Sequence, residues 1–217
     1  MKKLVIKLVF LFPLFFPVSI NAQKFDYGVF VGGNLNFLSA RSNYEIKNDL
    51  KFKPGFSYNL GGNVTTRIKM INLSVSIEYS RIRNTYNQSF WRIDGSPILE
   101  SKACITNHYI EVSGLGTMEI VRGLNVGVGL SGNYLLKSSM KLNAAINSAG
   151  QEMENDLISH TYRKIKFSIP VIIEYEIKKI RFFTRFNIGV MNRLNGDSFV
   201  KEIENPLVFG IGFRLNK

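Results

Sequence analysis

Histidine is the first residue type to consider, because it is the usual general base near neutral pH. His108 and His160 are the only histidines, and each lies near the end of an alternating apolar segment. Either could act as a general base in a hydrolase. Glu111 is the next inward-facing residue after Tyr109 in the strand and could orient the histidine. Two isolated histidines do not make a catalytic site without the right geometry. We therefore predict no catalytic residue, and an enzyme with a site at His108 or His160 is the alternative.

The remaining reactive motifs give no site either. The sequence GVGLSG (127–132) matches G-x-G-x-x-G, but it lies within an alternating segment, with no helix and no acidic residue about 20 positions later. Cys104 is the only cysteine, which excludes an intramolecular disulfide. We predict a loop thiol at Cys104, and a reactive or intermolecular role is the alternative. No Cys/His spacing suggests zinc, so we predict no metal and no cofactor.

The N-terminal residues have the features of a secretory signal peptide. The sequence MKKLVIKLVFLFPLFFPVSINA carries three lysines, then a short apolar run with two prolines, then small residues ending at Ala22. We predict that residues 1–22 are cleaved and that residues 23–217 form one domain. Removing them takes away three of the 28 basic residues and none of the 16 acidic ones, which leaves a net charge of +9. The remaining charges are scattered, so no nucleic-acid partner is predicted.

A period of two residues runs through the rest of the chain. In FSYNLGGNVTTRI (56–68), the even positions are mostly apolar and the odd positions are small and polar. The same alternation predicts eight β-strands and no helix. The predicted strands are 25–37, 56–68, 71–79, 110–120, 124–134, 165–177, 180–190 and 207–215.

Short and long connections alternate strictly between these strands. The short ones are Lys69-Met70, Val121–Gly123 and Lys178-Lys179, and the long ones are 39–55, 84–107, 137–163 and 193–206. A hairpin register with Ile68 opposite Ile71, Ile177 opposite Ile180 and Ile120 opposite Leu124 keeps each apolar set on one face. Gly123 supplies the left-handed residue of a three-residue turn. Strict alternation is typical of a transmembrane barrel with short periplasmic turns and long extracellular loops.

The composition of the two faces decides which one meets lipid. The polar face consists largely of Gly, Asn and Ser, which suit the crowded interior of an eight-stranded barrel. The apolar faces span about 9–11 residues with aromatic residues at both ends, as a bilayer requires. We predict an all-β, eight-stranded antiparallel up-and-down transmembrane β-barrel in the outer membrane. A soluble, periplasmic, lipocalin-like ligand-binding barrel with an apolar interior is the alternative.

With the apolar faces turned to lipid, the charged residues within the strands face inward, into the lumen. Glu176 lies opposite Arg181 across the Lys178-Lys179 turn, which predicts a cross-strand ion pair. The two signs are nearly balanced, so we expect a lumen filled by ion pairs rather than an open diffusion pore. The inward charges are Arg67, Lys164, Lys166, Arg181, Arg185, Arg214, Glu78, Glu111, Glu119, Glu174 and Glu176.

Four strands resemble those of a known family. YIEVSGLGTMEI (109–120) resembles the motif Tyr-(Leu/Ile)-Glu-(Ile/Val)-Pro of the PorT-like small outer-membrane β-barrel family, with Ser113 where that family often has proline. The segments 167–177, 27–38 and 208–215 are similar to other strands of the family. The resemblance implies the barrel fold and an outer-membrane location. Some members of the family assist protein secretion, so an accessory role in secretion is among the implied functions.

The C-terminal strand implies a partner during biogenesis. GIGFRL resembles the signal that the barrel-assembly machinery reads, with Gly210, Phe213 and Leu215 in place, although Asn216 and Lys217 follow it. Outer-membrane lipid is the second expected partner.

The extracellular loops are the expected site of a protein or glycan partner. Trp91 in SFWRIDGSPI (89–98) could anchor such a partner or pack over the barrel mouth. The predicted function is therefore non-enzymatic: a structural or accessory role, exercised through loops or rim.

Overall fold

The computed structural model describes residues 25–42, 51–91, 97–144, 151–153, 162–192, 194 and 200–216. The predicted signal peptide (1–22) and His160 lie outside these residues, so both stay predictions. Within the described part, the regular elements are β-strands. No helix among these residues is long and apolar enough to cross a membrane.

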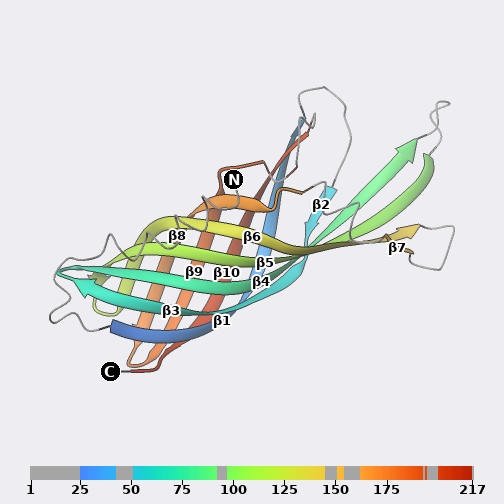
Figure 1. Cartoon of the computed structure of the whole chain (residues 1–217). Helices are drawn as coiled ribbons and strands as arrows, with labels where there is room; N and C mark the ends of the chain where they lie inside the picture. The colour runs from blue at the N-terminus through green and yellow to red at the C-terminus, as the bar shows by residue number, and fades with distance from the viewer. Residues whose placement is uncertain are drawn as a thin grey trace, which may run out of the picture.

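Eight long strands form a closed antiparallel barrel (Figure 1). Each pairs with its neighbours in chain order, and the last strand pairs with the first from Gly28 opposite Arg214 to Ser42 opposite Val200. This confirms the predicted all-β, eight-stranded, up-and-down barrel. The strands are β1 (Phe25–Ser42), β3 (Phe56–Ile68), β4 (Ile71–Trp91), β5 (Pro97–Val121), β6 (Leu124–Ala144), β8 (Ile165–Ile177), β9 (Ile180–Gly189) and β10 (Val200–Arg214).

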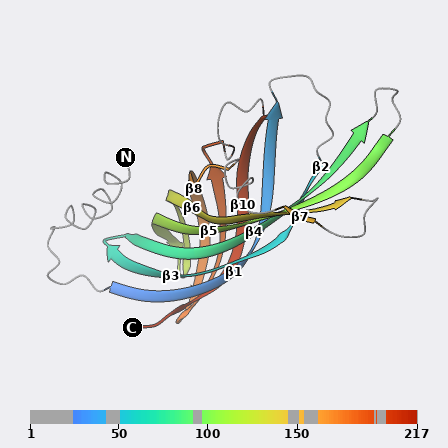
Figure 2. The same cartoon turned by 45° about the vertical axis from the view of Figure 1, so that its right-hand side comes forward.

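Two short strands, β2 (Lys51–Pro54) and β7 (Gln151–Met153), were not predicted. β2 pairs with β4 and β7 pairs with β6, so β2, β4, β5, β6 and β7 form one sheet beyond the barrel, which we call the outer sheet. Figures 1 and 2 show it extending away from the ribbon formed by β1 and β10. The predicted loop 84–107 is therefore largely wrong, because only residues 92–96 separate β4 from β5.

The short turns lie at the opposite end of the barrel. Ile68 is opposite Ile71 and Ile177 is opposite Ile180, as predicted. Gly123 has φ of 82°, which confirms the left-handed residue. The prediction that Ile120 lies opposite Leu124 is wrong. An irregularity at this residue lets Val121 pair with Leu124 instead.

The side chains face as the membrane barrel requires. Val75 is 52% exposed and Phe186 is 39% exposed on the outer wall, whereas Asn59 is fully buried in the lumen. An outer wall of exposed apolar side chains is stable in hydrocarbon and unfavourable in water. This arrangement excludes the lipocalin-like alternative, which needs the apolar set inside.

The lumen also holds a buried apolar cluster that was not predicted from the sequence. It consists of Phe30, Leu115, Ile172, Phe183 and Val208. Phe30 and Phe183 pack edge to face, with ring centroids 5.7 Å apart and planes at 89°. The lumen is therefore packed with aromatic and aliphatic side chains as well as polar ones.

Candidate functional site

The centre of the lumen is an ion-pair cluster that joins opposite walls. Arg185 on β9 donates to Glu78 on β4 at 2.5 Å and lies 3.6 Å from Glu111 on β5. The three side chains are at most 5% exposed. Asn59 also donates to Glu78 at 3.3 Å. Because β9 neighbours neither β4 nor β5 in the barrel, these contacts cross the lumen.

A second ion pair lies nearer the outer end. Lys166 on β8 pairs with Glu204 on β10, and its ammonium lies 3.8 Å from the centroid of the Tyr109 ring. The Tyr109 hydroxyl donates to Glu204 at 3.5 Å. Above this pair, a buried apolar cluster fills the outer mouth: Ile82, Ile105, Tyr109, Leu135 and Tyr162, with Leu38 and Leu194 packed against it.

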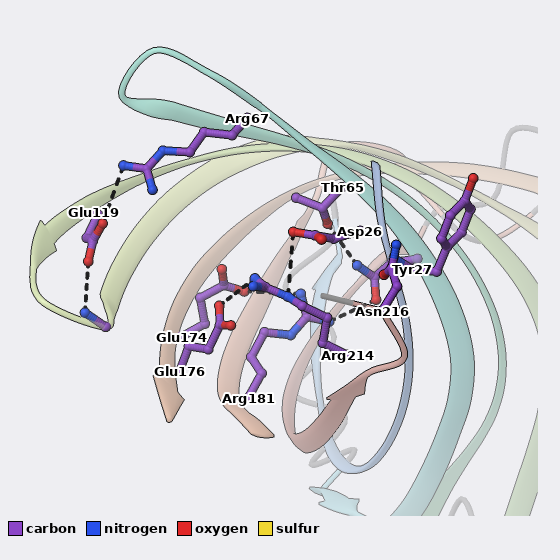
Figure 3. Close-up of polar contacts among 12 residues, drawn as sticks. Asp26, Tyr27, Thr65, Arg67, Glu119, Glu174, Glu176, Arg181, Arg214 and Asn216 are labelled. Carbon is purple, nitrogen blue, oxygen red and sulfur yellow. Dashed lines mark hydrogen bonds and ion pairs between the residues drawn. The ribbon is translucent and has the colours of Figure 1, made fainter. Parts of the chain in front are cut away.

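The short-turn end carries a third group of charges, which Figure 3 shows in close-up. Arg214 lies 2.8 Å from Glu176 and 3.7 Å from Asp26, and Arg181 lies 3.5 Å from Glu174. The predicted Glu176–Arg181 ion pair is therefore wrong, although the two residues are opposite each other in the register. Arginine is long enough to reach the diagonal neighbour instead.

The two ends of the barrel sequence are joined beside this group. The Asn216 side chain accepts a hydrogen bond from the Tyr27 amide at 2.7 Å and donates to the Phe25 carbonyl at 2.6 Å. On the neighbouring hairpins, Arg67 lies 3.6 Å from Glu119, which accepts from the Gly123 amide at 3.0 Å (Figure 3). These contacts fix the seam between β1 and β10 and the turns next to it.

The structure does not bring together His108 and Glu111, the described residues of the enzyme alternative. His108 faces outward from β5, and its Nδ1 lies 2.5 Å from the Tyr79 hydroxyl. Glu111 points into the lumen toward Arg185, so the prediction that Glu111 could orient this histidine is wrong. Alternate residues of a strand point to opposite faces, which separates the two side chains by the barrel wall. Among the described residues, no group of three His, Cys, Asp or Glu could hold a metal.

Cys104 and Trp91 both lie in strands rather than loops. The Cys104 thiol accepts a hydrogen bond from Arg83 Nε at 2.8 Å, so the prediction of a loop thiol is wrong. Trp91 ends β4, and its side chain is outside the described part of the structure. The choice between an anchor and a cover for the barrel mouth stays open.

An outward row of polar residues crosses four strands just above the apolar wall. Tyr58 is opposite Arg81, Arg81 is opposite His108, and His108 is opposite Lys137. Arg81 lies over the Tyr58 ring at 5.8 Å. We call these four residues the rim row. Tyr58 lies in the predicted strand 56–68, whereas the other three fall in or beside segments predicted as loops, so the row was not predicted from the sequence.

The surroundings of His108 in the rim row lower its pKa. His108 lies beyond the membrane-spanning stretch 110–120 of β5. Burial lowers the pKa of His108, and the nearby charges of Arg81 and Lys137 lower this pKa further. The imidazole is therefore neutral near pH 7.

A closed barrel with an apolar outer wall, and with its charged and polar residues turned into a filled lumen, is the architecture of an integral outer-membrane protein. The family model described as "Outer membrane protein beta-barrel domain" matches residues 21–195. The chain belongs to this family, and its location is the outer membrane.

Solved outer-membrane barrels are similar at low identity. Neisserial surface protein A is 10% identical, covering 87% of this chain and 97% of its own, with a TM-score of 0.45. Ail, the attachment invasion locus protein of Yersinia pestis, is 11% identical in its complex with the heparin analogue sucrose octasulfate, covering 88% and 99%, with a TM-score of 0.46. OprG from Pseudomonas aeruginosa is 9% identical, covering 90% and 98%, with a TM-score of 0.42. No curated protein matches the chain.

Proposed function

We propose that this chain is a non-enzymatic, non-conducting barrel whose accessory role is performed by the outer sheet. The observation that carries the proposal is the length of β4, β5 and β6. In each of these strands, about ten residues continue past the apolar wall and stay paired, as from Tyr79 opposite Ile110 to Phe90 opposite Leu99. A membrane anchor alone does not need such an extension.

The filled lumen supports the non-conducting part of the proposal. The Arg185 cluster, the Lys166–Glu204 pair and the two apolar clusters all lie inside the barrel. An eight-stranded barrel encloses little more than its own side chains. We therefore expect no measurable conductance of a small ion such as K⁺ in a planar bilayer.

The expected partner of the outer sheet is a protein or a glycan outside the cell. The resemblance of 109–120 to PorT-like proteins favours a role in protein secretion, with the barrel-assembly machinery acting only during biogenesis. The enzyme alternative has less support, because the described contacts of His108 are with Tyr79 rather than with an acid or a nucleophile.

A trimmed barrel tests the proposal. Residues 87–102 are replaced by Asn-Gly, which joins Tyr86 to Ala103, residues already opposite each other, through a two-residue hairpin turn. A deletion strain is complemented with the full chain or with the trimmed chain, and the proteins that reach the cell surface are compared. We expect the trimmed chain to fold and to fail in complementation.

A matched variant trims the other hairpin. Residues 143–150 are replaced by Asn-Gly between the paired residues Leu142 and Gln151. The gel mobility of unheated samples reports whether each barrel is folded. Full complementation by both folded, trimmed chains would show that the outer sheet has no part in the role. A lipid profile that changes when His160 is replaced by Ala would support the enzyme instead.

A further inference from the structure

The rim row carries positive charge toward the outside of the barrel. Arg81, His108 and Lys137 lie on three adjacent strands at the same height. Arg83 is the next outward-facing residue of β4 and lies above Arg81, further from the short turns. Neighbouring strands are about 4.8 Å apart, so the three residues span about 10 Å. This width suits one phosphorylated headgroup.

The height of the rim row is set by the side chains beneath it. The next row of outward-facing residues lies closer to the short turns. It is apolar and aromatic and consists of Leu60, Tyr79, Ile110 and Tyr134. Above that row, on β4 and β5, the polarity of the wall inverts, since Ile82 and Ile105 point inward while Arg81 and His108 point outward. The short turns lie at the periplasmic end, so the rim row lies at the level of the outer-leaflet headgroups.

The cations of the rim row differ from those of the lumen. Lys166, Arg181, Arg185 and Arg214 each have a carboxylate partner inside the barrel. In the part of the chain that the structure describes, no carboxylate pairs with Arg81 or Lys137. On β3 to β6, the acidic residues with described side chains are Glu78, Glu111 and Glu119, and these point inward. Among the described side chains of β3 to β6, the outer wall therefore offers cations at headgroup height and no acid to neutralise them.

We propose that Arg81, His108 and Lys137 bind the phosphate of an outer-leaflet lipid headgroup. The Arg81 guanidinium presents a fork that matches two phosphate oxygens, and Lys137 adds a point charge. Nδ1 of His108 lies within hydrogen-bond distance of the Tyr79 hydroxyl. In the tautomer in which the hydroxyl donates to Nδ1, the imidazole proton is on Nε2 and can be donated to a third oxygen. The acyl chains of the same lipid pack on the apolar row below.

The test measures lipid binding to the folded, full-length barrel in detergent. The probes are lipid A with both phosphates and the same lipid after removal of the phosphates, and the readout is native mass spectrometry. Each cation near an anionic lipid surface raises the binding affinity about fivefold. The double variant Arg81→Gln/Lys137→Gln removes two cations, so we expect it to bind the phosphorylated lipid about 25-fold more weakly. Removing the phosphates from the lipid should weaken binding to the wild type to a similar extent.

A matched control removes the same charges at the periplasmic turns. Arg122→Gln/Lys178→Gln replaces one exposed arginine and one exposed lysine far from the rim row, and its affinity should stay within about twofold of wild type. If the rim double variant does not fold, Arg81→Lys keeps the charge, removes the fork and should give an intermediate loss. Gel mobility of the unheated barrel verifies folding.

Four results would overturn the proposal. Wild-type affinity in the folded rim variants would exclude these residues, and an equal loss in the turn control would indicate a general charge effect. Equal binding of the lipid without phosphates would leave only acyl-chain contacts. Displacement of the lipid by excess inorganic phosphate, or by a sulfated glycan at the same concentration as the lipid, would identify a free-anion or glycan site instead.

Discussion

Replacing Arg185 with Met should destabilise the barrel strongly, because it leaves two buried carboxylates without their cation. Arg185 contacts Glu78 at 2.5 Å and Glu111 at 3.6 Å, and the side chains are 3%, 2% and 5% exposed, respectively. Breaking a buried ion pair by removing one partner costs about 3–5 kcal/mol. Two carboxylates share this arginine, so we expect the upper part of that range.

The assay is unfolding by urea in lipid vesicles, followed by the gel mobility of the folded and unfolded chain. The matched control is Arg214→Met, the same chemical change at the short-turn rim. Arg214 also pairs with two carboxylates, Asp26 and Glu176, but its side chain is 37% exposed. Water replaces the lost partner there, and the expected loss is about 0–1 kcal/mol.

The reasoning that water does not reach the centre of the lumen depends on the difference in stability loss between Arg185→Met and Arg214→Met. Equal losses for Arg185→Met and Arg214→Met would refute it, because they would mean that water reaches the centre of the lumen as freely as the rim. The triple variant Glu78→Gln/Glu111→Gln/Arg185→Met removes all three charges. It should recover most of the stability lost in Arg185→Met, because neutral side chains are far less costly to bury than unpaired ions.

Three other substitutions and measurements test separate parts of the structure. Val75→Arg places a charge at the middle of the lipid-facing wall and should cost about 2–4 kcal/mol in vesicle unfolding, whereas a wall facing water would tolerate it. Phe183→Ala removes one ring of the edge-to-face pair with Phe30 and should cost about 3–5 kcal/mol; a loss below about 1 kcal/mol would indicate a loosely packed lumen. His108 should titrate below its usual pKa of about 6.5 because of burial and the charge of Arg81, and Arg81→Gln should raise this pKa. An NMR titration of the imidazole measures both values, and an unchanged midpoint in the variant would contradict the placement of the two residues.

The two-residue period was sufficient to predict the number of long strands and the direction of each face, but not how far β4, β5 and β6 continue past the apolar wall. Hydrocarbon outside the barrel demands an apolar side chain at every second position, so the signal is present in each strand. The register at the two-residue turns was also predictable, as for Ile68 opposite Ile71. The irregularity at Ile120 was not, because a bulge depends on local backbone geometry that the alternation does not encode.

The contacts across the lumen could not be predicted from register. Register gives lateral neighbours, and Arg185 reaches Glu78 from a strand that is not one of them. The apolar lumen cluster did leave a signal in the sequence, since Phe30 interrupts a polar phase and lies opposite Gly61. A Cβ at Gly61 would lie 2.7 Å from the Phe30 ring, so the glycine makes room for the aromatic side chain.

The polarity of β4 and β5 fixes the depth of the barrel in the membrane. In both strands the alternation of facing continues without interruption past the apolar wall, but the outward residues change from Tyr79 and Ile110 to Arg81 and His108. One row of outward-facing residues corresponds to about 7 Å along the strands. Moving the barrel deeper into the membrane by this distance would bring Arg81 and Lys137 into hydrocarbon. Each buried cation would then cost up to about 2–4 kcal/mol, depending on its depth. Moving the barrel the other way would expose the apolar row to water, so the boundary lies between the two rows.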